Sequence, residues 1–295
     1  MDIWDDLRWF VVFNGIADAT LWGFDADGWR LRHGDPANGM LGILPGDEGG
    51  PLASLADALW LADALAFDHD APVGVSPAVQ GLFPDIEPKD PAALPANHPV
   101  DPFNERLFLH YWESLNAAYG AAADLRFNAP YAVRYNSDFP DPGTNFSERF
   151  KDRESLLALY AMATRQADLL AEYLCLYRVL EGADGANGKA FIARELPHLI
   201  DRDFGLLRVG DLGVSRVWAW TDAFRLYKFR SRIELDRLTA DGETDVATHL
   251  YRIRNSLAHG KTDVLTGRYD SGFQDAARAL PIVKLLARVA VDATA

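Results

Sequence analysis

The chain has 295 residues, a length that accommodates two ordinary domains or one large one. Its composition, 49% hydrophobic and 24% charged, is that of a globular protein and excludes wholesale disorder, because disordered chains lack the apolar surface that offsets ordering entropy. The net charge of −14 is concentrated in residues 1–150, which carry 8 basic against 23 acidic residues, whereas residues 151–261 carry 17 against 16. Charge therefore disfavours nucleic-acid binding by the first half only.

Residues 1–145 predict an acidic, mixed α+β domain. Aromatic and β-branched residues over 8–13 favour a strand, and residues 20–24 and 29–33 flank a turn as a hairpin does. Apolar residues at helical spacing predict a helix over 52–67. Residues 72–102 contain 8 of the 16 prolines, which predicts an irregular connection. A helix over 104–119 and a strand over 131–135 complete the domain.

Residues 146–295 predict an all-helical domain. Apolar positions recur at helical spacing, and the connections between the periodic segments are short, which is typical of a helix bundle. The predicted helices span residues 152–181, 189–200, 215–239, 245–259 and 271–291, the last with Pro281 inside it. The predicted fold class is therefore α+β, a mixed region followed by a helical bundle.

Common catalytic, phosphate-binding and metal-binding signatures are absent from the sequence. The seven histidines do not show metal-ligand spacing, and the single cysteine, Cys175, indicates a buried core thiol. We therefore expect no metal and no cofactor. Without a basic signal segment or an apolar run of about 20 residues, we expect a cytoplasmic protein with no membrane association.

The segment from Tyr251 to Lys261 (YRIRNSLAHGK) carries the densest set of chemically capable side chains. On a helix, Leu250, Ile253 and Leu257 form an apolar stripe. A polar stripe on another face contains Arg252, Asn255, Ser256 and His259, and Arg254 lies at the border. A purely structural interpretation stays open: His259 and Gly260 can cap the helix, and the arginines can be solvated or paired with Glu172, Glu181 or Glu195.

The spacing Arg254-Asn255-x-x-x-His259, late in a helical domain, resembles the R-x(4–6)-H motif of the HEPN superfamily. The helix around 172–181 is similar to the helix that precedes this motif in Apea-like HEPN domains and in methylamine-utilisation-type proteins. The resemblance covers roughly residues 150–290. It implies a bundle that forms a homodimer and, in many members, a metal-independent endoribonuclease. Other members are inactive and bind RNA or a partner.

Carried onto this sequence, the resemblance implies catalytic roles for three residues. His259 would act as general acid or base, Arg254 would hold the scissile phosphate, and Asn255 would orient His259 or the phosphate. Arg252 also fits the looser end of the motif, so the choice between the two arginines stays open, and we assign Arg252 to substrate binding.

A second segment, residues 216–232, interleaves basic and aromatic residues, a pattern found in proteins that bind unpaired RNA. Its predicted substrate-binding residues are Arg225, Lys228, Arg230 and Arg232. The alternative is a helix with a core aromatic face and a solvated basic face.

The leading hypothesis is therefore an RNA-binding, metal-independent endoribonuclease, which the resemblance places in a toxin or phage-defence setting, with a regulatory partner at the acidic domain. The alternative is a catalytically inactive dimeric scaffold that binds a partner. A third hypothesis, a metabolic enzyme, needs a small-molecule pocket lined by Trp9, Trp22 and Trp29.

Overall fold

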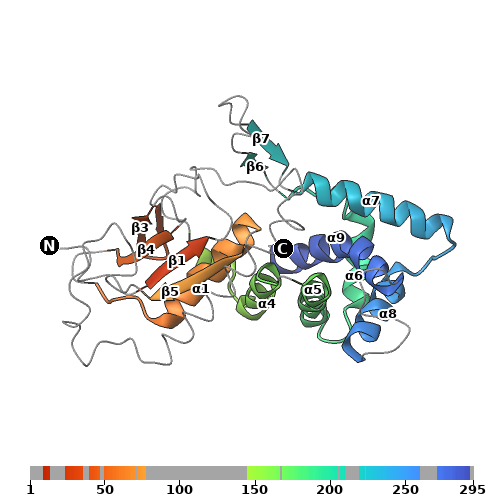
Figure 1. Cartoon of the computed structure of the whole chain (residues 1–295), viewed down its shortest axis with the longest axis horizontal. Helices are drawn as coiled ribbons and strands as arrows, with labels where there is room; N and C mark the ends of the chain where they lie inside the picture. The colour runs from red at the N-terminus through yellow and green to blue at the C-terminus, as the bar shows by residue number, and fades with distance from the viewer. Residues whose placement is uncertain are drawn as a thin grey trace. The chain divides into compact units, whose positions relative to one another are not determined.

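The structure, a computed structural model, divides the chain into two compact units (Figure 1). One unit contains Met1–Ala62 and Val73–Asn145, and the other contains Asp63–Pro72 and Phe146–Ala295. The residues described are 9–13, 24–35, 40–46, 50–70, 72–77, 145–166, 168–204, 206–209, 219–222, 224–259 and 271–292.

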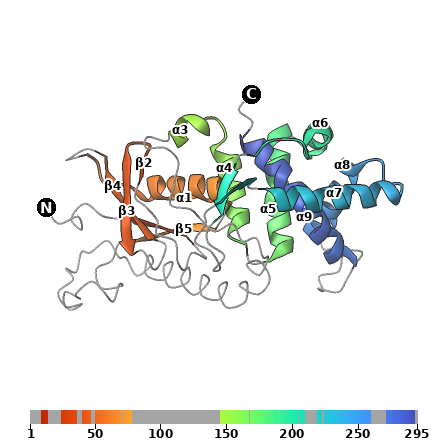
Figure 2. The same ribbon diagram turned by 90° about the horizontal axis from the view of Figure 1, so that it is seen from above.

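The first unit contains a five-stranded antiparallel sheet with the order β2-β3-β4-β1-β5. Its strands are β1 (Trp9–Phe13), β2 (Phe24–Ala26), β3 (Trp29–Asp35), β4 (Met40–Pro45) and β5 (Val73–Pro77). Figure 2 labels four of these strands, β2, β3, β4 and β5. Asp27 and Gly28 join β2 to β3, both with positive φ (49° and 79°), as the two-residue turns favoured in hairpins require.

Helix α1 (Leu55–His69) begins at a reciprocal cap. The Asp57 backbone N–H donates to the Ser54 hydroxyl, and the Ser54 backbone N–H donates to the Asp57 carboxylate at 2.8 Å. Trp60 Nε1 donates to Asp27 Oδ2 at 3.2 Å, which connects the first half of α1 to the β2–β3 turn.

The structure confirms the predicted α+β class, including the first strand, the hairpin and the helix over 52–67. The prediction of an irregular connection from residue 72 is wrong at its start, because Val73–Pro77 forms edge strand β5. An edge position tolerates Pro77, since no second partner strand needs its missing N–H. The predicted helix over 104–119 and strand over 131–135 lie outside the described residues.

The second unit is a helical bundle with a short two-stranded ribbon. Its elements are α3 (Phe146–Arg149), α4 (Glu154–Thr164), α5 (Leu169–Asp184), α6 (Lys189–Glu195), the 3₁₀ turn Leu196–His198, β6 (Leu206–Val209), β7 (Ala219–Asp222), α7 (Arg225–Ala240), α8 (Val246–His259) and α9 (Ser271–Asp292).

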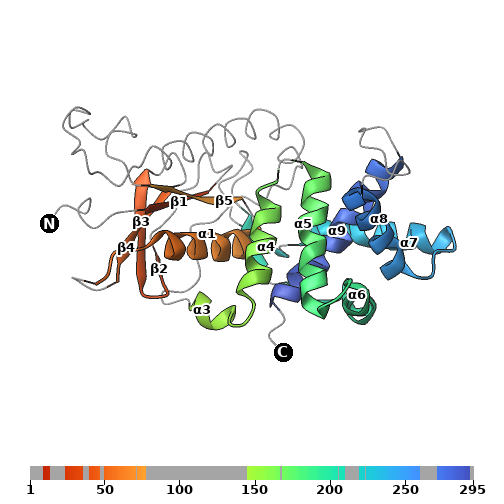
Figure 3. The ribbon, with the colours of Figure 1, turned by 90° about the horizontal axis from the view of Figure 1, so that it is seen from below.

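Helix α9 is the central element of the bundle (Figure 3). Every residue from 281 to 291 is buried, and α9 contacts α4, α5, α6, α7 and α8. This burial explains why its last three turns are apolar on nearly every face.

The predicted helix over 152–181 is in fact two helices, α4 and α5. Asp168 interrupts it: its carboxylate accepts hydrogen bonds from the backbone N–H groups of Leu170 and Ala171, both at 2.9 Å, and so caps α5. Gly185, with φ of 69°, ends α5 in the left-handed conformation. The helical spacing of apolar residues continues across Asp168, so the only sign of the boundary between α4 and α5 is the capping role of this residue.

The predicted helix over 215–239 is also too long at its start. Residues 219–222 form strand β7, and the helix begins at Arg225. Trp220 pairs with Arg208 in the ribbon. It therefore lies outside the helix, although the prediction placed it inside. The helix over 189–200 shortens to α6 and a 3₁₀ turn containing Pro197.

The last part of α1, from Asp63, belongs to the bundle. The Phe67 ring packs edge-on against Phe150 and Tyr160, with centroids 5.3 and 5.0 Å away. Asp68 pairs with Arg149 at 2.6 Å, and Asp63 pairs with Arg165 at 2.5 Å. Residues far from the bundle in sequence therefore complete its core.

Candidate functional site

Helix α8 carries the predicted motif and begins at Val246, directly after Asp245, whose carboxylate accepts from the Thr248 backbone N–H at 2.9 Å. Its buried face differs from the predicted one: Ser256 is buried and Leu257 is only half-buried. The interior face also includes His249, which is 7% exposed. Ser256 therefore does not belong to a solvent-facing polar stripe.

The Arg254 guanidinium is paired with Glu181, which lies in the last turns of α5. Arg254 Nε lies 2.9 Å from Glu181 Oε1, and Nη2 donates to Oε2 at 3.1 Å. Arg254 Nη1 donates to Asn255 Oδ1 at 3.1 Å. The structure thus brings Arg254 and Asn255 together, and it places a carboxylate from another helix beside them.

Two tyrosine rings lie near the Arg254–Glu181 pair, which is the Arg254–Glu181 site below. The rings, those of Tyr177 of α5 and Tyr251 of α8, have centroids 6.4 Å apart, and Lys189 Nζ lies 5.5 Å from the Tyr251 ring centre. The Tyr177 hydroxyl donates to the Asn187 carbonyl at 3.1 Å. Burial raises the pKa of Tyr177 most, and the negative charge of Glu181 raises it further. This phenol is therefore neutral at physiological pH.

A second contact holds α5 against α8 without using charge. The Tyr173 hydroxyl is buried and donates to the Leu250 carbonyl at 2.9 Å. It therefore fixes the spacing of the two helices independently of the Arg254–Glu181 pair.

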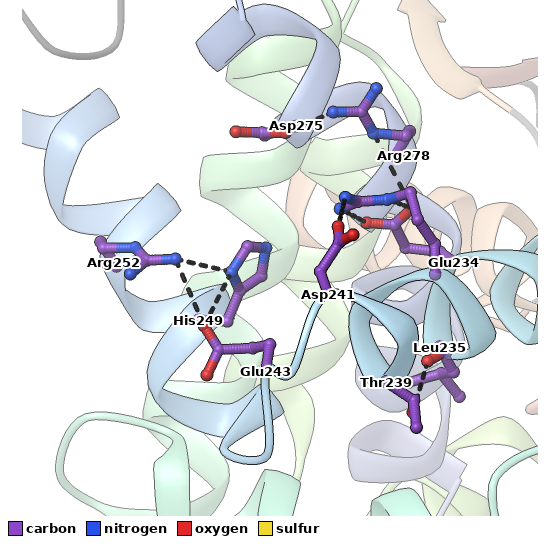
Figure 4. Close-up of polar contacts among 10 residues, drawn as sticks. Glu234, Leu235, Thr239, Asp241, Glu243, His249, Arg252, Asp275 and Arg278 are labelled. Atoms are coloured by element: carbon purple, nitrogen blue, oxygen red, sulfur yellow. Dashed lines mark hydrogen bonds and ion pairs between the residues drawn. The ribbon is translucent and has the colours of Figure 1, made fainter.

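Arg252 leaves α8 about 160° away from Arg254 around the helix axis, and Figure 4 shows it beside His249 and Glu243. Its Nη2 lies 2.8 Å from His249 Nδ1 and 3.5 Å from Glu243 Oε2. Because a guanidinium only donates, Nδ1 accepts, and the neutral His249 ring carries its proton on Nε2. Burial lowers the pKa of His249 most, and the positive charge of Arg252 lowers it further. The structure therefore does not bring the two candidate arginines together.

The residues around His249 form a shallow depression of about 280 Å³. Figure 4 shows Asp241, Glu243, Asp275 and other charged groups facing it from α7, the following loop and α9. Each nearby guanidinium already has an acidic partner: Arg237 pairs with Glu234 at 2.6 Å, and Arg278 pairs with Asp275 at 2.5 Å. The lining carries two guanidinium groups, Arg237 and Arg252, against three carboxylates, so the depression is slightly acidic and does not favour an anionic ligand.

His259 is the last residue of α8 and is exposed. At about 100° per residue, its side chain leaves the helix roughly 140° away from that of Arg254 and only about 20° away from that of Arg252. Within one chain, therefore, His259 and Arg254 face different directions.

The four substrate-binding residues predicted in the basic segment lie on α7, whereas residues 219–222 of that segment form β7. Arg225, Arg230 and Arg232 are exposed, whereas Lys228 is half-buried with its Nζ 5.5 Å from the Phe204 ring centre. Phe229 is 62% exposed on the same helix. The three arginines have no ion pair with any residue that the structure describes, unlike most arginines of this bundle.

Sequence reasoning missed a buried ionic cluster around Lys284 of α9. Lys284 Nζ lies 2.9 Å from Asp70 Oδ1 and 3.6 Å from Glu172 Oε1, and Tyr160 donates to Asp70 at 2.7 Å. These attractive charges raise the pKa of Lys284 despite its burial. The sequence signal for this cluster is Lys284 itself, within an otherwise apolar stretch of α9.

Within the described ranges, no group of three His, Cys, Asp or Glu side chains is arranged to hold a metal ion. Cys175 is half-buried, and burial raises the pKa of its thiol.

Trp9 and Trp29 lie on strands separated by β4, and Trp22 is outside the described residues. No described helix has the length and apolarity needed to cross a membrane.

Comparison with known proteins places the similarity in the second unit. Residues 156–292 match the model of the family described as methylamine utilization protein MauJ. None of the curated proteins or solved structures compared matches the chain. The matched region runs from α4 to the end of α9, so the second unit, with the Arg254–Glu181 site and the basic start of α7, is the part of this chain that is similar to MauJ.

Proposed function

We propose that the second unit is a HEPN-like RNA-binding bundle with metal-independent endoribonuclease activity. The observation that carries the proposal is the end of α8, where Arg254 and Asn255 are hydrogen-bonded to each other and an exposed His259 follows five residues after Arg254. The match to MauJ over the same region supports a shared bundle architecture.

The chemistry follows from the residue types. His259 removes the proton from a ribose 2′-hydroxyl, and the 2′-oxygen attacks the adjacent phosphorus. The bond to the 5′-oxygen breaks as this oxygen takes up a proton, from water or from the protonated imidazole of a His259, which leaves a 2′,3′-cyclic phosphate and a 5′-hydroxyl. Arg254 stabilises the negative charge that develops on the phosphate oxygens. Asn255 orients the guanidinium through its side-chain carbonyl.

Helix geometry favours a site shared by two copies. Because His259 and Arg254 diverge by about 140° on one helix, a single phosphate meets both groups more readily when each comes from a different copy. A homodimer with a two-fold axis near the ends of the two α8 helices provides that arrangement. This proposal therefore couples activity to dimerisation.

The basic start of α7 supports RNA as the substrate. Cations at a helix N-terminus are unfavourable because the helix dipole is positive there. Arg225 nevertheless begins α7, the first turn of this helix contains no acidic residue, and the exposed Arg230 and Arg232 follow on the same helix. An anionic ligand compensates this repulsion. Exposed Phe229 adds a surface on which an unpaired base can stack.

One observation favours the alternative, an inactive scaffold that binds a partner. The bidentate pair with Glu181 gives Arg254 a structural role in holding α8 to α5. In a scaffold, Arg254→Ala lowers stability or weakens the dimer, and the wild type does not cleave RNA.

The experiment that separates the two functions compares wild type with Arg254→Ala and His259→Ala. Each protein is first tested for folding by circular dichroism and for oligomeric state by light scattering, and then incubated with transfer RNA in EDTA. We expect cleavage by wild type and a loss of about 100-fold or more in each folded variant. Unimpaired cleavage by folded His259→Ala would exclude it from the chemistry.

A further inference from the structure

We propose that Glu181 is a competing anion that occupies Arg254 in the resting protein and is displaced by an RNA phosphate. This inference rests on the proposed function, whose phosphate-binding group is Arg254. It adds a regulatory residue, Glu181, in a helix outside the predicted motif.

The geometry of the pair supports competition. Two of the five N–H donors of the Arg254 guanidinium are in hydrogen bonds, one to Glu181 and one to Asn255, and Nε lies 2.9 Å from the other Glu181 oxygen. The Glu181 carboxylate thus covers the edge of the guanidinium that a phosphate would also use. A phosphate at any other donor would lie beside the Glu181 charge, so strong phosphate binding requires that carboxylate to leave.

Partial exposure makes the exchange feasible. The side chains of Arg254 and Glu181 are 23% and 19% exposed, so both reach solvent at their edges. Departure of Glu181 does not require α5 and α8 to separate, because the buried Tyr173 hydroxyl still binds the Leu250 carbonyl. A side-chain rotation of Glu181 is sufficient.

Local charge also disfavours a Glu181 that remains in place during binding. Glu181 and Asp184 both act on Tyr177 from the end of α5, and Lys189 is the nearby cation, over Tyr251. With Glu181 paired, Arg254 offers no net positive charge to RNA. Its release restores one unpaired cation at the site.

The test measures binding of a single-stranded 2′-O-methyl oligonucleotide, which lacks the attacking hydroxyl and so separates binding from cleavage. Glu181→Gln keeps the size of the side chain and removes its charge. We expect its affinity to be roughly tenfold higher than that of wild type, because one repulsive charge beside the phosphate is lost.

Two control variants and one double variant show whether a gain in affinity comes from freeing Arg254. Glu195→Gln changes the net charge by the same amount on α6, where Glu195 pairs with Arg194 and Arg202, and we expect no gain. Tyr173→Phe removes the other hydrogen bond described between α5 and α8 and should not raise affinity either. In the Arg254→Ala background, Glu181→Gln should give no gain.

Weaker or unchanged binding by folded Glu181→Gln, a gain that Glu195→Gln reproduces, or a gain that persists without Arg254 would overturn the proposal. Cleavage assays keep the two ideas distinct. If wild type does not cleave RNA but Glu181→Gln gains affinity through Arg254, the ribonuclease assignment fails and the competing anion stands. If wild type cleaves and Glu181→Gln cleaves more slowly without tighter binding, Glu181 instead positions Arg254, and only the competing anion fails.

Discussion

Arg252 and Arg254 are two positions apart on one helix, and their surroundings differ because they leave α8 on opposite sides. Arg254 meets a carboxylate from α5, whereas Arg252 meets His249 on its own helix and Glu243 in the preceding loop. Arg252 is also the more exposed, at 64% against 23% for the side chains. The motif arginine that the proposed chemistry needs is therefore the one held in a defined orientation.

His249 makes stability depend on pH. Burial lowers its pKa below the ordinary value of 6.5, so the unfolded chain binds the proton more readily than the folded protein does. The free energy of unfolding is consequently highest above about pH 6.5 and falls as the pH is lowered towards the folded pKa.

Urea unfolding at pH 7.5 and pH 5.5 checks this prediction. Wild type should lose more stability between these values than His249→Gln does, and His198→Gln, at an exposed position, should behave like wild type. An equal loss in wild type and His249→Gln would contradict the assignment.

At the scale of elements, α7 combines two surfaces with different roles. Its buried face, with Ser231, Glu234 and Leu238, packs on α9. Its outer face carries exposed arginines and two exposed apolar side chains, Phe229 and Ile233. A helix of this kind is held by one face and leaves the other available for a ligand.

The outer face of α7 predicts the salt dependence of RNA binding. Replacing Arg225 or Arg232 with Ala should lower the slope of log affinity against log salt by about 0.7 each, since each arginine releases a counterion from a phosphate of single-stranded RNA. Fluorescence anisotropy between 50 and 200 mM salt, roughly the range in which such effects are resolved, measures the slope. Arg178→Ala, which removes an exposed arginine of α5, should leave it unchanged. Wild-type slopes in both α7 variants would contradict an RNA-binding role for this face.

At the scale of the whole molecule, the second unit depends on a segment that is remote in sequence. Residues from Asp63 onward supply a partner for Arg165, one for Arg149 and one for the buried Lys284. In a fragment that begins at residue 146, Lys284 loses the carboxylate of Asp70 and keeps only the more distant one of Glu172, at 3.6 Å, and the Tyr227 hydroxyl. Removing one partner of a buried ion pair is strongly destabilising.

We therefore expect fragment 146–295 to lose about 3 kcal/mol or more of unfolding free energy relative to the same unit in the full chain. A synthetic peptide covering residues 55–72 should raise the melting temperature of the fragment, and the same peptide with Phe67→Ala and Asp70→Asn should not. A fragment as stable as the full-chain unit, with no response to the peptide, would show that α1 is dispensable.

Features set by residues close together in sequence could be predicted, and features set by contacts between distant residues could not. Periodicity placed α8 and α9 nearly to the residue, because helical faces are local patterns. It missed the break at Asp168, where a single capping carboxylate overrides a continuous apolar pattern. It listed Glu181 only as one of three possible partners, and it missed the Lys284 cluster, since long-range pairing has no periodic signal.

The central claim is that the end of α8 cleaves RNA without a metal ion, and the nature of the product ends tests it most directly. Purified wild-type protein is incubated in EDTA with a labelled oligoribonucleotide, beside a copy carrying 2′-O-methyl groups, and the products are analysed by mass spectrometry. We predict 2′,3′-cyclic phosphate and 5′-hydroxyl ends from the unmodified strand, with no cleavage of the methylated strand and none by His259→Ala. Cleavage of the methylated strand, or cyclic-phosphate products from His259→Ala at the wild-type rate, would contradict the account.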